Sequence, residues 1–406
     1  MQELSIEKLI TGGLGLARDD RGVILVEGAL PGEVVLASVR EARGVRRGVT
    51  RHVLRESPER VESAGLPTTD LAHARYAAQL AFKRAFVEEA VTRIAKLDVA
   101  VGETVPSPHA WAYRTTVQYL LHEGRFAYRE RRGHAPVPVA ADPLAAPPIQ
   151  RVMTRVDPRE LAPARELVLR GSLATGEVLA ALIGEGHPRA YRRAADALMD
   201  AGAVGVSLAA PSERRFAGGA RLVAGEPVIL ERYGNLDLSV SAVGFAQVNP
   251  AAAGALYVRA AALAGRGEAA LDLYGGAGGF GLHVAPAFRH VTVLDVAEEA
   301  VRRGERDAAR LGVPNITFRR EDARAAGPAD VVIVDPPRAG LSHEARQAVV
   351  DSGAGRVVYV SCDPATWARD VGAFARDGWQ LQCVIPYDFY PQTHHVEVLS
   401  VLTRDA

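Results

Sequence analysis

Apolar and polar positions alternate over short stretches in the first 55 residues of the chain. The stretches are LITGGLGLA, GVILVEGALPGEVVLASV and GVRRGVTRHVL, and glycine pairs and a Pro-Gly turn separate them. Alternation with a period of two indicates strands, and short strands with frequent turns are typical of a small all-β domain. We therefore predict a β-barrel over residues 1–55.

The pattern changes in the middle of the chain, over residues 56–245. Apolar residues recur at helical spacing between Ala72 and Lys96, which predicts a helix there. Strands are expected near 113–130 and 136–140, and a further helix near 187–201. This mixture predicts a central α+β domain.

Residues 246–406 contain short, continuous apolar runs that alternate with helical segments. The runs are LDLY (271–274), VTVLD (291–295), DVVIVD (330–335) and RVVYVS (356–361). Continuous apolar strands between helices indicate a doubly wound parallel sheet, Rossmann-like, which binds ligands beyond the carboxyl ends of its strands. The fold class is thus α/β, preceded by the small barrel and the mixed central domain.

Composition and charge narrow the class of protein. Of the 406 residues 48% are hydrophobic, and no window approaches the roughly 18 consecutive apolar residues of a membrane helix. We expect a cytoplasmic, monomeric protein without membrane association. The only two cysteines, Cys362 and Cys383, cannot build a disulfide framework and lack metal-site spacing, so no metal is expected.

The 48 basic and 48 acidic residues balance, but the arginines are clustered. One cluster lies between residues 40 and 60, and a second, around residue 130, is interleaved with Phe126 and Tyr128. Guanidinium groups bind phosphate while aromatic rings stack on unpaired bases, so this pattern favours RNA. A solvated face in an arginine-rich chain is the alternative. The candidate RNA-binding residues are Arg46, Arg47, Arg51, Arg129, Arg131, Arg132 and Arg338.

A glycine-rich segment, LDLYGGAGGF, follows the first apolar run of the last 160 residues. Gly276, Gly278 and Gly279 would let the backbone approach a ligand closely, and Asp295 ends the next strand, where an acid binds ribose hydroxyls. The acidic Asp272 at the strand end fits S-adenosylmethionine better than a pyrophosphate, whose charge it would repel. A nucleoside-containing cofactor is therefore predicted.

Cys362 stands between an apolar run and an apparent helix start, with Asp363 as N-cap and Pro364 at the first helical position. A helix N-terminus is one way to lower the pKa of a thiol, which favours a nucleophile. A buried structural cysteine is the alternative, and it is the interpretation we adopt for Cys383.

Two further segments carry candidate chemistry. Asp335-Pro-Pro-Arg338 is a rigid turn that holds a carboxylate and a guanidinium at the edge of the sheet. Glu397, in HHVEVLSVL, shares a strand face with Leu399 and Val401, and an apolar setting raises the pKa of a carboxyl and suits a general base. A salt-bridged residue at a sheet edge is the alternative for Glu397.

These motifs together resemble a known family. DPPRAGL, SCDPATWARD, HHVE, LDLYGGAGGFGL and GFAQVNP cover residues 244–397 and resemble the S-adenosylmethionine-dependent RNA uracil-C5 methyltransferases, which make 5-methyluridine. The resemblance implies Cys362 as nucleophile and Glu397 as base, and a methyltransferase domain over 246–406. It also implies that Gln247, Tyr274, Asp295 and Asp335 line the cofactor and uracil pocket. The segment with ALPGE resembles a TRAM domain, an RNA-binding barrel of the OB-like kind.

The chain departs from the family in one respect. Many relatives hold an iron–sulfur cluster with four cysteines, but the corresponding region here has none, and Asp142 stands near the expected place of the last one. We expect no cluster. The resemblance favours ribosomal RNA of the large subunit over tRNA as substrate. The rival hypotheses are an amino-group methyltransferase, whose Asp-Pro-Pro motif ends in an aromatic residue where Arg338 stands, and a non-catalytic RNA-binding factor.

Overall fold

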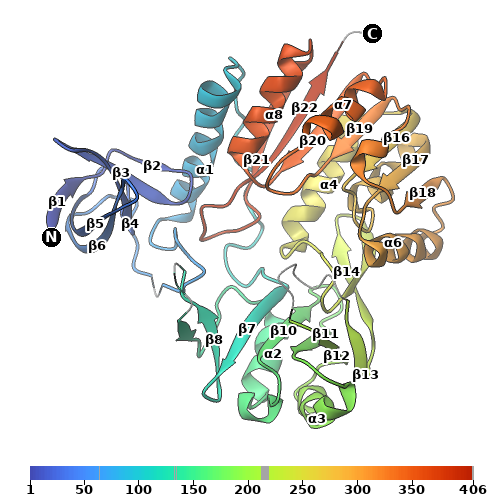
Figure 1. Ribbon diagram of the computed structural model, residues 1–406, viewed down its shortest axis with the longest axis horizontal. Coiled ribbons are helices and arrows are strands. Elements are labelled where there is room, and N and C mark those ends of the chain that lie inside the picture. The colour runs from blue at the N-terminus through green and yellow to red at the C-terminus, as the bar shows by residue number, and fades with distance from the viewer. Residues whose placement is uncertain (64, 132, 134, 212–218, 405–406) are drawn as a thin grey trace.

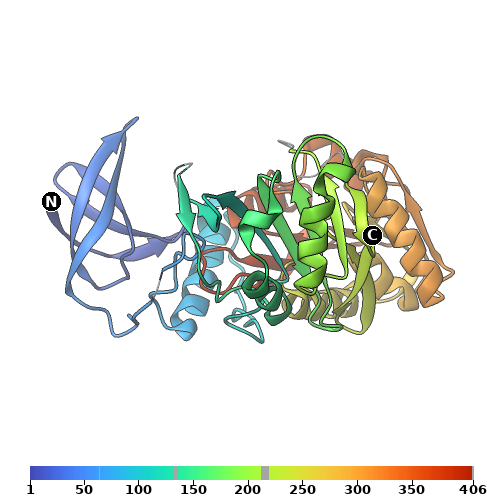
Figure 2. The ribbon, with the colours of Figure 1, turned by 90° about the horizontal axis from the view of Figure 1, so that it is seen from below.

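The computed structural model describes residues 1–63, 65–131, 133, 135–211 and 219–404, and within them the chain forms three large sheets and one separate hairpin. Figure 1 shows the N-terminal sheet at the left, the central sheet below and the C-terminal sheet at the upper right. Seen from below, in Figure 2, the N-terminal sheet again stands apart from the other two. The three parts of the molecule follow one another along the chain.

The N-terminal sheet has the strand order β1-β5-β6-β4-β3-β2. Its strands are β1 (Gln2–Ser5), β2 (Lys8–Ile10), β3 (Leu14–Asp19), β4 (Gly22–Glu27), β5 (Val34–Ala42) and β6 (Val45–Arg55). The predicted alternation is confirmed on β4, where Ile24 and Val26 are fully buried. Closure of this sheet into a TRAM-like or OB-like barrel stays a prediction.

The central sheet has the order β13-β12-β11-β10-β7-β8-β9. Its strands are β7 (Thr116–His122), β8 (Arg125–Arg129), β9 (Pro136–Pro138), β10 (Glu166–Gly171), β11 (Val178–Ile183), β12 (Gly205–Ala209) and β13 (Arg221–Gly225). The associated helical segments are α2 (Pro147–Arg155), η2 (Pro158–Leu161), η3 (Pro188–Tyr191) and α3 (Arg192–Asp200). The strands expected near 113–130 and 136–140 and the helix near 187–201 are confirmed.

Two elements between residues 56 and 245 pack outside the central sheet. The predicted helix is confirmed as α1 (Tyr76–Ala90), which continues as a π-helical turn, η1 (Val91–Ala95). Its apolar residues Val87 and Val91 join the core of the C-terminal sheet. The hairpin of β14 (Val228–Tyr233) and β15 (Leu236–Ser241) also packs on that unit. Residues 56–245 are therefore divided between two cores.

The C-terminal sheet has the order β18-β17-β16-β19-β20-β22-β21. Its strands are β16 (Gly267–Leu273), β17 (Phe288–Leu294), β18 (Ile316–Arg319), β19 (Val331–Val334), β20 (Arg356–Ser361), β21 (Gln380–Tyr387) and β22 (Glu397–Thr403). The helical segments are α4 (Pro250–Ala264), α5 (Gly279–Val284), η4 (Ala285–Ala287), α6 (Glu298–Leu311), η5 (Ala323–Ala325), α7 (His343–Asp351) and α8 (Pro364–Arg376). No helix among the described residues combines the length and the apolar character needed to cross a membrane.

The four apolar runs read from the sequence are confirmed as β16, β17, β19 and β20, and these strands pair with one another in parallel. One strand differs from the predicted parallel sheet, because β22 runs antiparallel to both of its neighbours, β20 and β21. An antiparallel strand begins at the edge where its parallel neighbours end. The first residue of β22, Glu397, therefore lies at the ligand-binding edge of the sheet.

The loop between β21 and β22, residues 388–396, is held by side chains from distant parts of the chain. The Lys83 ammonium on α1 lies 2.5 Å from the Asp388 carboxylate, and both side chains are fully buried. The same ammonium donates to the Tyr390 carbonyl at 3.0 Å. Gln79 exchanges two hydrogen bonds with Gln392, at 2.8 and 2.9 Å. We call residues 388–396 the clamped loop.

Replacing Lys83 with Met should destabilise the protein strongly. The substitution leaves the Asp388 carboxylate buried without its cation, and breaking a buried ion pair in this way costs about 3 to 5 kcal/mol. Lys8→Met is the matched control, since Lys8 forms a more exposed pair with Glu89 and should lose less than about 1 kcal/mol. Urea unfolding of both variants measures the difference. Equal losses in the free energy of unfolding would show that the buried pair contributes no more to stability than the exposed one.

Candidate active site

The glycine-rich segment forms the turn between β16 and α5. Gly276 and Gly278 adopt positive φ angles of 57° and 80°, which a residue with a side chain seldom adopts. A Cβ atom at Gly275 would lie 2.6 Å from the Asp272 carboxylate. The backbone therefore passes so close to the strand end that only glycine fits, as the sequence predicts for a ligand-binding turn.

Two carboxylates hold this turn in place. Asp272 is fully buried and accepts a hydrogen bond from the Gly281 amide at 2.8 Å, while its Oδ1 atom has no partner among the described residues. Asp295 accepts from the amides of Gly276 at 2.9 Å and Ala297 at 2.7 Å. Burial raises the pKa of Asp272 to about 8. Its Oδ1 atom is thus a buried acceptor without a donor, directly behind the glycine-rich turn.

Cys362 follows β20 and lies immediately before α8. The predicted cap is confirmed, because the Asp363 side chain accepts from the Ala365 and Thr366 amides at 3.0 and 2.9 Å, and Pro364 is the first helical residue. Cys362 is half-buried, as is Cys383. The thiol thus lies at a rigid strand-to-helix turn on the ligand-binding edge.

Sheet register brings Glu397 to Cys362. Ser361 of β20 pairs with Val398 of β22, so the next residue of one strand and the preceding residue of the other are neighbours. The Glu397 side chain is 3% exposed. Burial is the main reason that its pKa is raised well above the usual value, and the Asp335 charge adds to the effect. This confirms the expected apolar setting of Glu397.

The prediction that a helix N-terminus lowers the pKa of Cys362 is wrong. The pKa is raised to about 11, first by burial and then by the carboxylates of Glu397 and Asp335. The positive charge of the Arg338 guanidinium opposes this rise. The helix lies where the sequence places it, but burial of the thiol and the acidic neighbours outweigh its effect on the pKa.

The site as a whole is acidic. The pKa of Asp335, which follows β19, is raised to about 7 by burial, and Asp272, Asp295 and Glu397 lie at the same edge of the sheet. Charges of one sign around a partly enclosed site concentrate the opposite charge. The arrangement therefore suits a cationic group such as a sulfonium.

The other predicted pocket residues also lie near this edge. Tyr274 follows β16 with a positive φ of 60° and packs against the core of the sheet. Gln247 is half-buried in the segment before α4, and its carbonyl accepts from the Tyr233 hydroxyl at 3.1 Å. The following Asn249 caps α4 and donates to the Phe389 carbonyl of the clamped loop at 3.1 Å.

The structure adds residues that the sequence patterns did not single out. The Tyr257 hydroxyl on α4 has its pKa raised well above the usual value by burial and by the charges of Asp335, Asp272 and Glu397. Phe245 is 77% exposed, in the segment that leads to Gln247. An exposed aromatic residue can stack on a base. No local sequence pattern distinguishes Tyr257 from a core residue of an alanine-rich helix.

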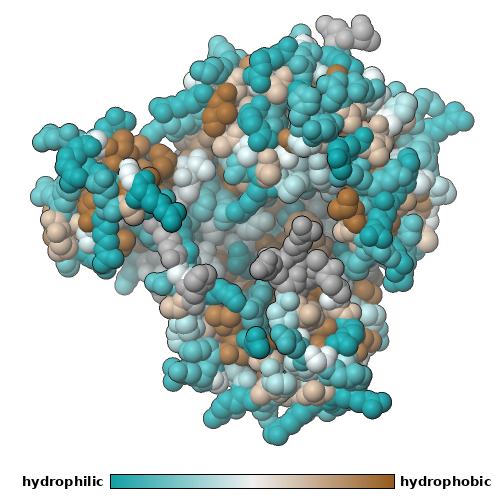
Figure 3. Space-filling view, viewed as in Figure 1, coloured by the Kyte–Doolittle hydropathy of each residue, from teal (hydrophilic) through white to brown (hydrophobic). Residues whose placement is uncertain are grey.

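The candidate RNA-binding arginines differ in their surroundings. Arg47 and Arg51 are exposed on one face of β6, where they alternate with Val45 and Val49, which are 42% and 39% exposed. Figure 3 shows hydrophobic side chains gathered on the N-terminal sheet within a largely hydrophilic face. Arg129 is also exposed and pairs with Glu166.

Two of the candidate arginines form ion pairs with carboxylates of the protein itself. Arg46 is 9% exposed and forms a two-pronged ion pair with Asp19. Arg131 pairs with Asp70 at 2.5 Å and lies 3.5 Å from Glu27. Both guanidinium groups therefore stabilise the fold where we had expected phosphate contacts. Arg132 lies outside the described residues, and Arg338 is exposed beside the active site.

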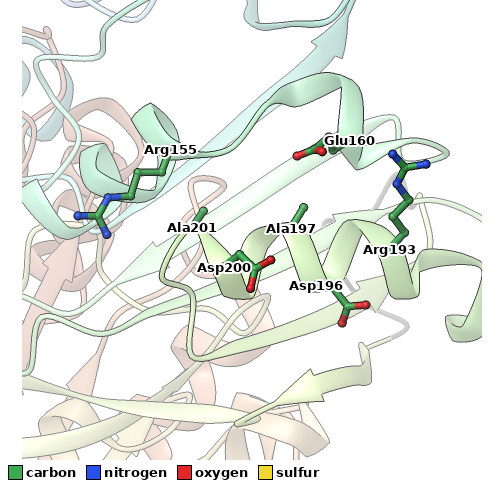
Figure 4. A pocket seen from close by; sticks show the side chains of 7 residues that line it. All are labelled: Arg155, Glu160, Arg193, Asp196, Ala197, Asp200 and Ala201. Carbon is green, nitrogen blue, oxygen red and sulfur yellow. The ribbon is translucent and has the colours of Figure 1, made fainter.

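A separate depression lies on the central domain. It has a volume of about 310 Å³, and Figure 4 shows Glu160 and Asp200 facing it, with Arg155 and Arg193 at opposite ends. Its lining carries charges of both signs and includes no residue of the C-terminal sheet. It is therefore unrelated to the chemistry at Cys362.

Asp142, which stands near the expected place of the last cluster cysteine, is a buried hydrogen-bond acceptor. Asp142 is 2% exposed and accepts from the hydroxyls of Tyr119 at 2.9 Å and Tyr128 at 2.5 Å. Among the described residues no group of three or more His, Cys, Asp or Glu side chains is arranged to hold a metal ion. The absence of a cluster stays a prediction.

Known proteins resemble this chain over its whole length. The family model for tRNA (uracil-5-)-methyltransferase matches residues 325–405. An uncharacterised RNA methyltransferase of Lactobacillus johnsonii is 30% identical over 99% of this chain and 98% of its own, and one of Halalkalibacterium halodurans is 30% identical over 98% and 96%. The crystal structure of Pyrococcus abyssi tRNA (uracil-54, C5)-methyltransferase in complex with S-adenosyl-L-homocysteine is 26% identical, covers 99% of this chain and 100% of its own, and gives a TM-score of 0.79.

The fold and the site define an α/β methyltransferase that acts on RNA. The chain belongs to the S-adenosylmethionine-dependent RNA uracil-C5 methyltransferase family, which confirms the resemblance read from the sequence motifs. The residues present fit this methyl donor, because the glycine-rich turn is bordered by the carboxyls of Asp272 and Asp295, and one buried oxygen of Asp272 has no partner among the described residues. Membership of this family also argues against the amino-group methyltransferase and the non-catalytic factor.

Binding of S-adenosylmethionine should strengthen as the pH rises from about 6 to 8.5. Asp272 and Asp335, with pKa values near 8 and 7, are largely protonated at the lower pH, and a sulfonium favours their ionised forms. For each proton that is released on binding, the affinity rises by at most about tenfold per pH unit. Calorimetry in buffers of different ionisation enthalpy measures both the affinity and the proton release.

S-adenosylhomocysteine is the matched control, since it keeps the ribose and the amino group but lacks the sulfonium charge. Its affinity should change less with pH, and the Asp335→Asn variant should show a weaker dependence with S-adenosylmethionine. An identical pH dependence for the two ligands would show that the carboxylates do not sense the sulfonium.

Proposed function

We propose that this protein transfers a methyl group from S-adenosylmethionine to C5 of a uridine in RNA, through a covalent bond between Cys362 Sγ and C6 of the base. The observation that carries the proposal is the meeting of Cys362 and Glu397 across β20 and β22, beside Asp335 and the glycine-rich turn. A thiol and a carboxyl on neighbouring residues of paired strands can act on adjacent carbons of one ring.

The chemistry needs both groups. Uracil C5 is too weak a nucleophile to accept a methyl group unaided, and addition of the Cys362 thiolate to C6 moves electron density to C5 as an enolate. C5 then takes the methyl group, and the cofactor leaves as S-adenosylhomocysteine. Glu397 removes the C5 proton, the C6–S bond breaks, and the thiolate is released. Each turnover therefore returns Cys362 to its starting form.

The electrostatics of the free protein fit this order of events. The pKa of about 11 keeps the Cys362 thiol protonated until the site fills. A bound sulfonium would offset the carboxylates of Asp335 and Glu397, which lowers the free energy of the thiolate. The thiol therefore ionises more readily once the methyl donor is bound.

The remaining pocket residues have roles that follow from their positions. Asp295 would accept the ribose hydroxyls, and the backbone of Gly276, Gly278 and Gly279 would pass close to the cofactor. Tyr274, Gln247 and Asp335 would line the space between cofactor and base. The target uridine must leave its stack to enter, which costs least in a loop or a single strand.

The RNA-binding surface is proposed to include Arg47, Arg51, Arg129 and Arg338, which are exposed. Val45 and Val49 between the arginines of β6 offer apolar contact to sugars and bases. Phe245 offers an exposed ring at the entrance segment of the site. Arg46 and Arg131 are left out because their side chains are only 10% and 25% exposed and are paired with carboxylates, whereas the paired Arg129 side chain is 51% exposed.

The RNA substrate has two candidates. The sequence resemblance favours ribosomal RNA of the large subunit. The second candidate is tRNA, because the solved structure that matches the full length of the chain is of a tRNA methyltransferase. Mass-spectrometric mapping of 5-methyluridine in both RNAs from a strain that lacks this gene decides between them.

A Glu397→Gln variant should trap the covalent intermediate. The amide cannot take the C5 proton, so attack and methylation proceed while release falls by about 10² to 10⁴, the usual contribution of a positioned base. On a denaturing gel, the variant incubated with RNA and cofactor should give a slow band that contains both protein and RNA. Cys362→Ala and the double variant should give none.

Cofactor binding by each variant, measured by calorimetry, controls for a damaged fold. Cys383→Ala is the matched cysteine control and should methylate normally, because Cys383 lies on β21 away from Glu397. Cys362→Ala with near wild-type methylation would falsify the nucleophile.

A double variant, Arg47→Ala with Arg51→Ala, should weaken RNA binding and leave cofactor binding unchanged. Each lost phosphate contact lowers the slope of log affinity against log salt by about 0.7 to 0.9. Point substitutions test this better than removal of residues 1–55, since Leu9 and Leu30 of that segment share a core with Leu71 and Phe86. Filter binding over a salt series gives the slope.

The control pair is Arg289→Ala with Arg306→Ala, two exposed arginines on β17 and α6. These elements lie at the opposite end of the molecule from β6 (Figure 1). The same loss of affinity in both pairs would mean that charge in general, and not the surface of β6, governs binding.

A further inference from the structure

His395 lies two residues before Glu397 and faces the Arg338 side chain. Its Nδ1 atom is 3.4 Å from Nη2 of Arg338. A guanidinium can only donate hydrogen bonds, so Nδ1 must be the acceptor and the ring proton must be on Nε2. The contact therefore requires a neutral imidazole.

Arg338 is the group that favours the Cys362 thiolate. Burial and the nearby carboxylates of Glu397 and Asp335 oppose ionisation of the thiol, while the positive charge of the guanidinium favours it. The Arg338 backbone is anchored, because its carbonyl accepts from the Thr366 hydroxyl at 2.9 Å. Its side chain forms no ion pair with a carboxylate among the described residues, so the orientation of the guanidinium depends on His395.

The surroundings of His395 keep the ring in place and neutral. Its ring contacts Tyr390 at a centroid distance of 5.7 Å and His394 at 4.1 Å, and its amide donates to the Thr393 hydroxyl at 3.3 Å. The charged groups that face it are Arg338, Lys83, Asp70 and, when protonated, His394. Burial and the cations lower its pKa to about 3, so the ring stays neutral at physiological pH.

The residue next to His395 is anchored from outside the C-terminal sheet. The Asp70 carboxylate accepts from the His394 amide at 2.7 Å and contacts the His394 ring at 2.5 Å. Arg131 of the central domain holds the same carboxylate. The backbone that presents His395 to Arg338 is therefore fixed.

We propose that His395 is a positioning residue for the nucleophile: its Nδ1 atom holds the Arg338 guanidinium against the Cys362 thiol. This inference rests on the proposed function, in which Cys362 must ionise in order to attack C6. His395 touches neither reacting atom in this arrangement and acts through Arg338. A substitution that removes the acceptor should release the guanidinium to solvent and leave the thiol among carboxylates alone.

The reactivity of the thiol tests this directly, without RNA or cofactor. In a Cys383→Ala background only one cysteine remains, and its rate of alkylation by iodoacetamide at pH 8.5 follows the thiolate fraction. His395→Ala should lower that rate by about three- to tenfold, which corresponds to a rise of about half to one unit in the pKa of the thiol. Arg338→Ala should lower the rate by a similar factor.

Two further variants separate positioning from a general disturbance of the fold. His395→Asn offers an amide oxygen close to the position of Nδ1 and should restore most of the wild-type rate. His395→Ala in the Arg338→Ala background should have no additional effect, because the two residues act through one contact. His290→Ala, on the exposed part of β17, is the matched histidine control.

The inference is overturned if His395→Ala alkylates within twofold of the parent, or if it lowers the rate equally with and without Arg338. The proposed function is tested separately: near wild-type RNA methylation by Cys362→Ala would contradict it. An enzyme that methylates through Cys362 but shows no effect of His395 on alkylation would contradict only the positioning role.

Discussion

The buried contact between Lys83 and Asp388 is the interaction on which the active site most depends. It fixes the start of the clamped loop, and the residue that follows that loop is Glu397, the first residue of β22. The two partners are 305 residues apart in the chain. Uncompensated charge in a protein interior is costly, so a loop that drifted from α1 would leave an ammonium and a carboxylate without partners. The position of Glu397 therefore depends on α1, a helix that lies outside the sheet, whereas Cys362 follows a strand of the sheet itself.

The active site brings together several acidic groups, and the ionised form of each is disfavoured by burial or by its neighbours. Burial raises the pKa values of Asp272, Asp335 and Glu397, and the Asp335 charge adds to the rise for the other two. Burial and the charges of Glu397 and Asp335 also raise the pKa of Cys362. In a site of this kind the ionised carboxylates lack a compensating positive charge until a cation binds. The sulfonium of the methyl donor has the charge that is missing, so cofactor binding and activation of the thiol are linked by electrostatics. Arg338 supplies a smaller part of that charge permanently.

The sequence predicted the parts of this structure that depend on local patterns. The apolar runs gave the four parallel strands, and Cys362-Asp363-Pro364 gave the helix start, because capping and strand burial are set by neighbouring residues. The antiparallel β22 was not predicted, since strand direction depends on long-range pairing. The pairing of Arg46 with Asp19 and the raised pKa of Cys362 were missed for the same reason. Charge counts along a chain do not reveal which charges meet in space.

The junction around Asp70 shows how the separate parts of the chain form one enzyme. Asp70 joins Arg131 of the central domain to His394 of the clamped loop, and the turn at Gly12 and Gly13 of the N-terminal sheet packs on the same group. These contacts are short and mostly enclosed, so they resist relative motion of the parts they join. The separation between the exposed arginines of β6 and the thiol of Cys362 is therefore fixed by the protein. An RNA that binds both must adapt its own shape to that separation, which makes RNA shape a source of selectivity in addition to base recognition.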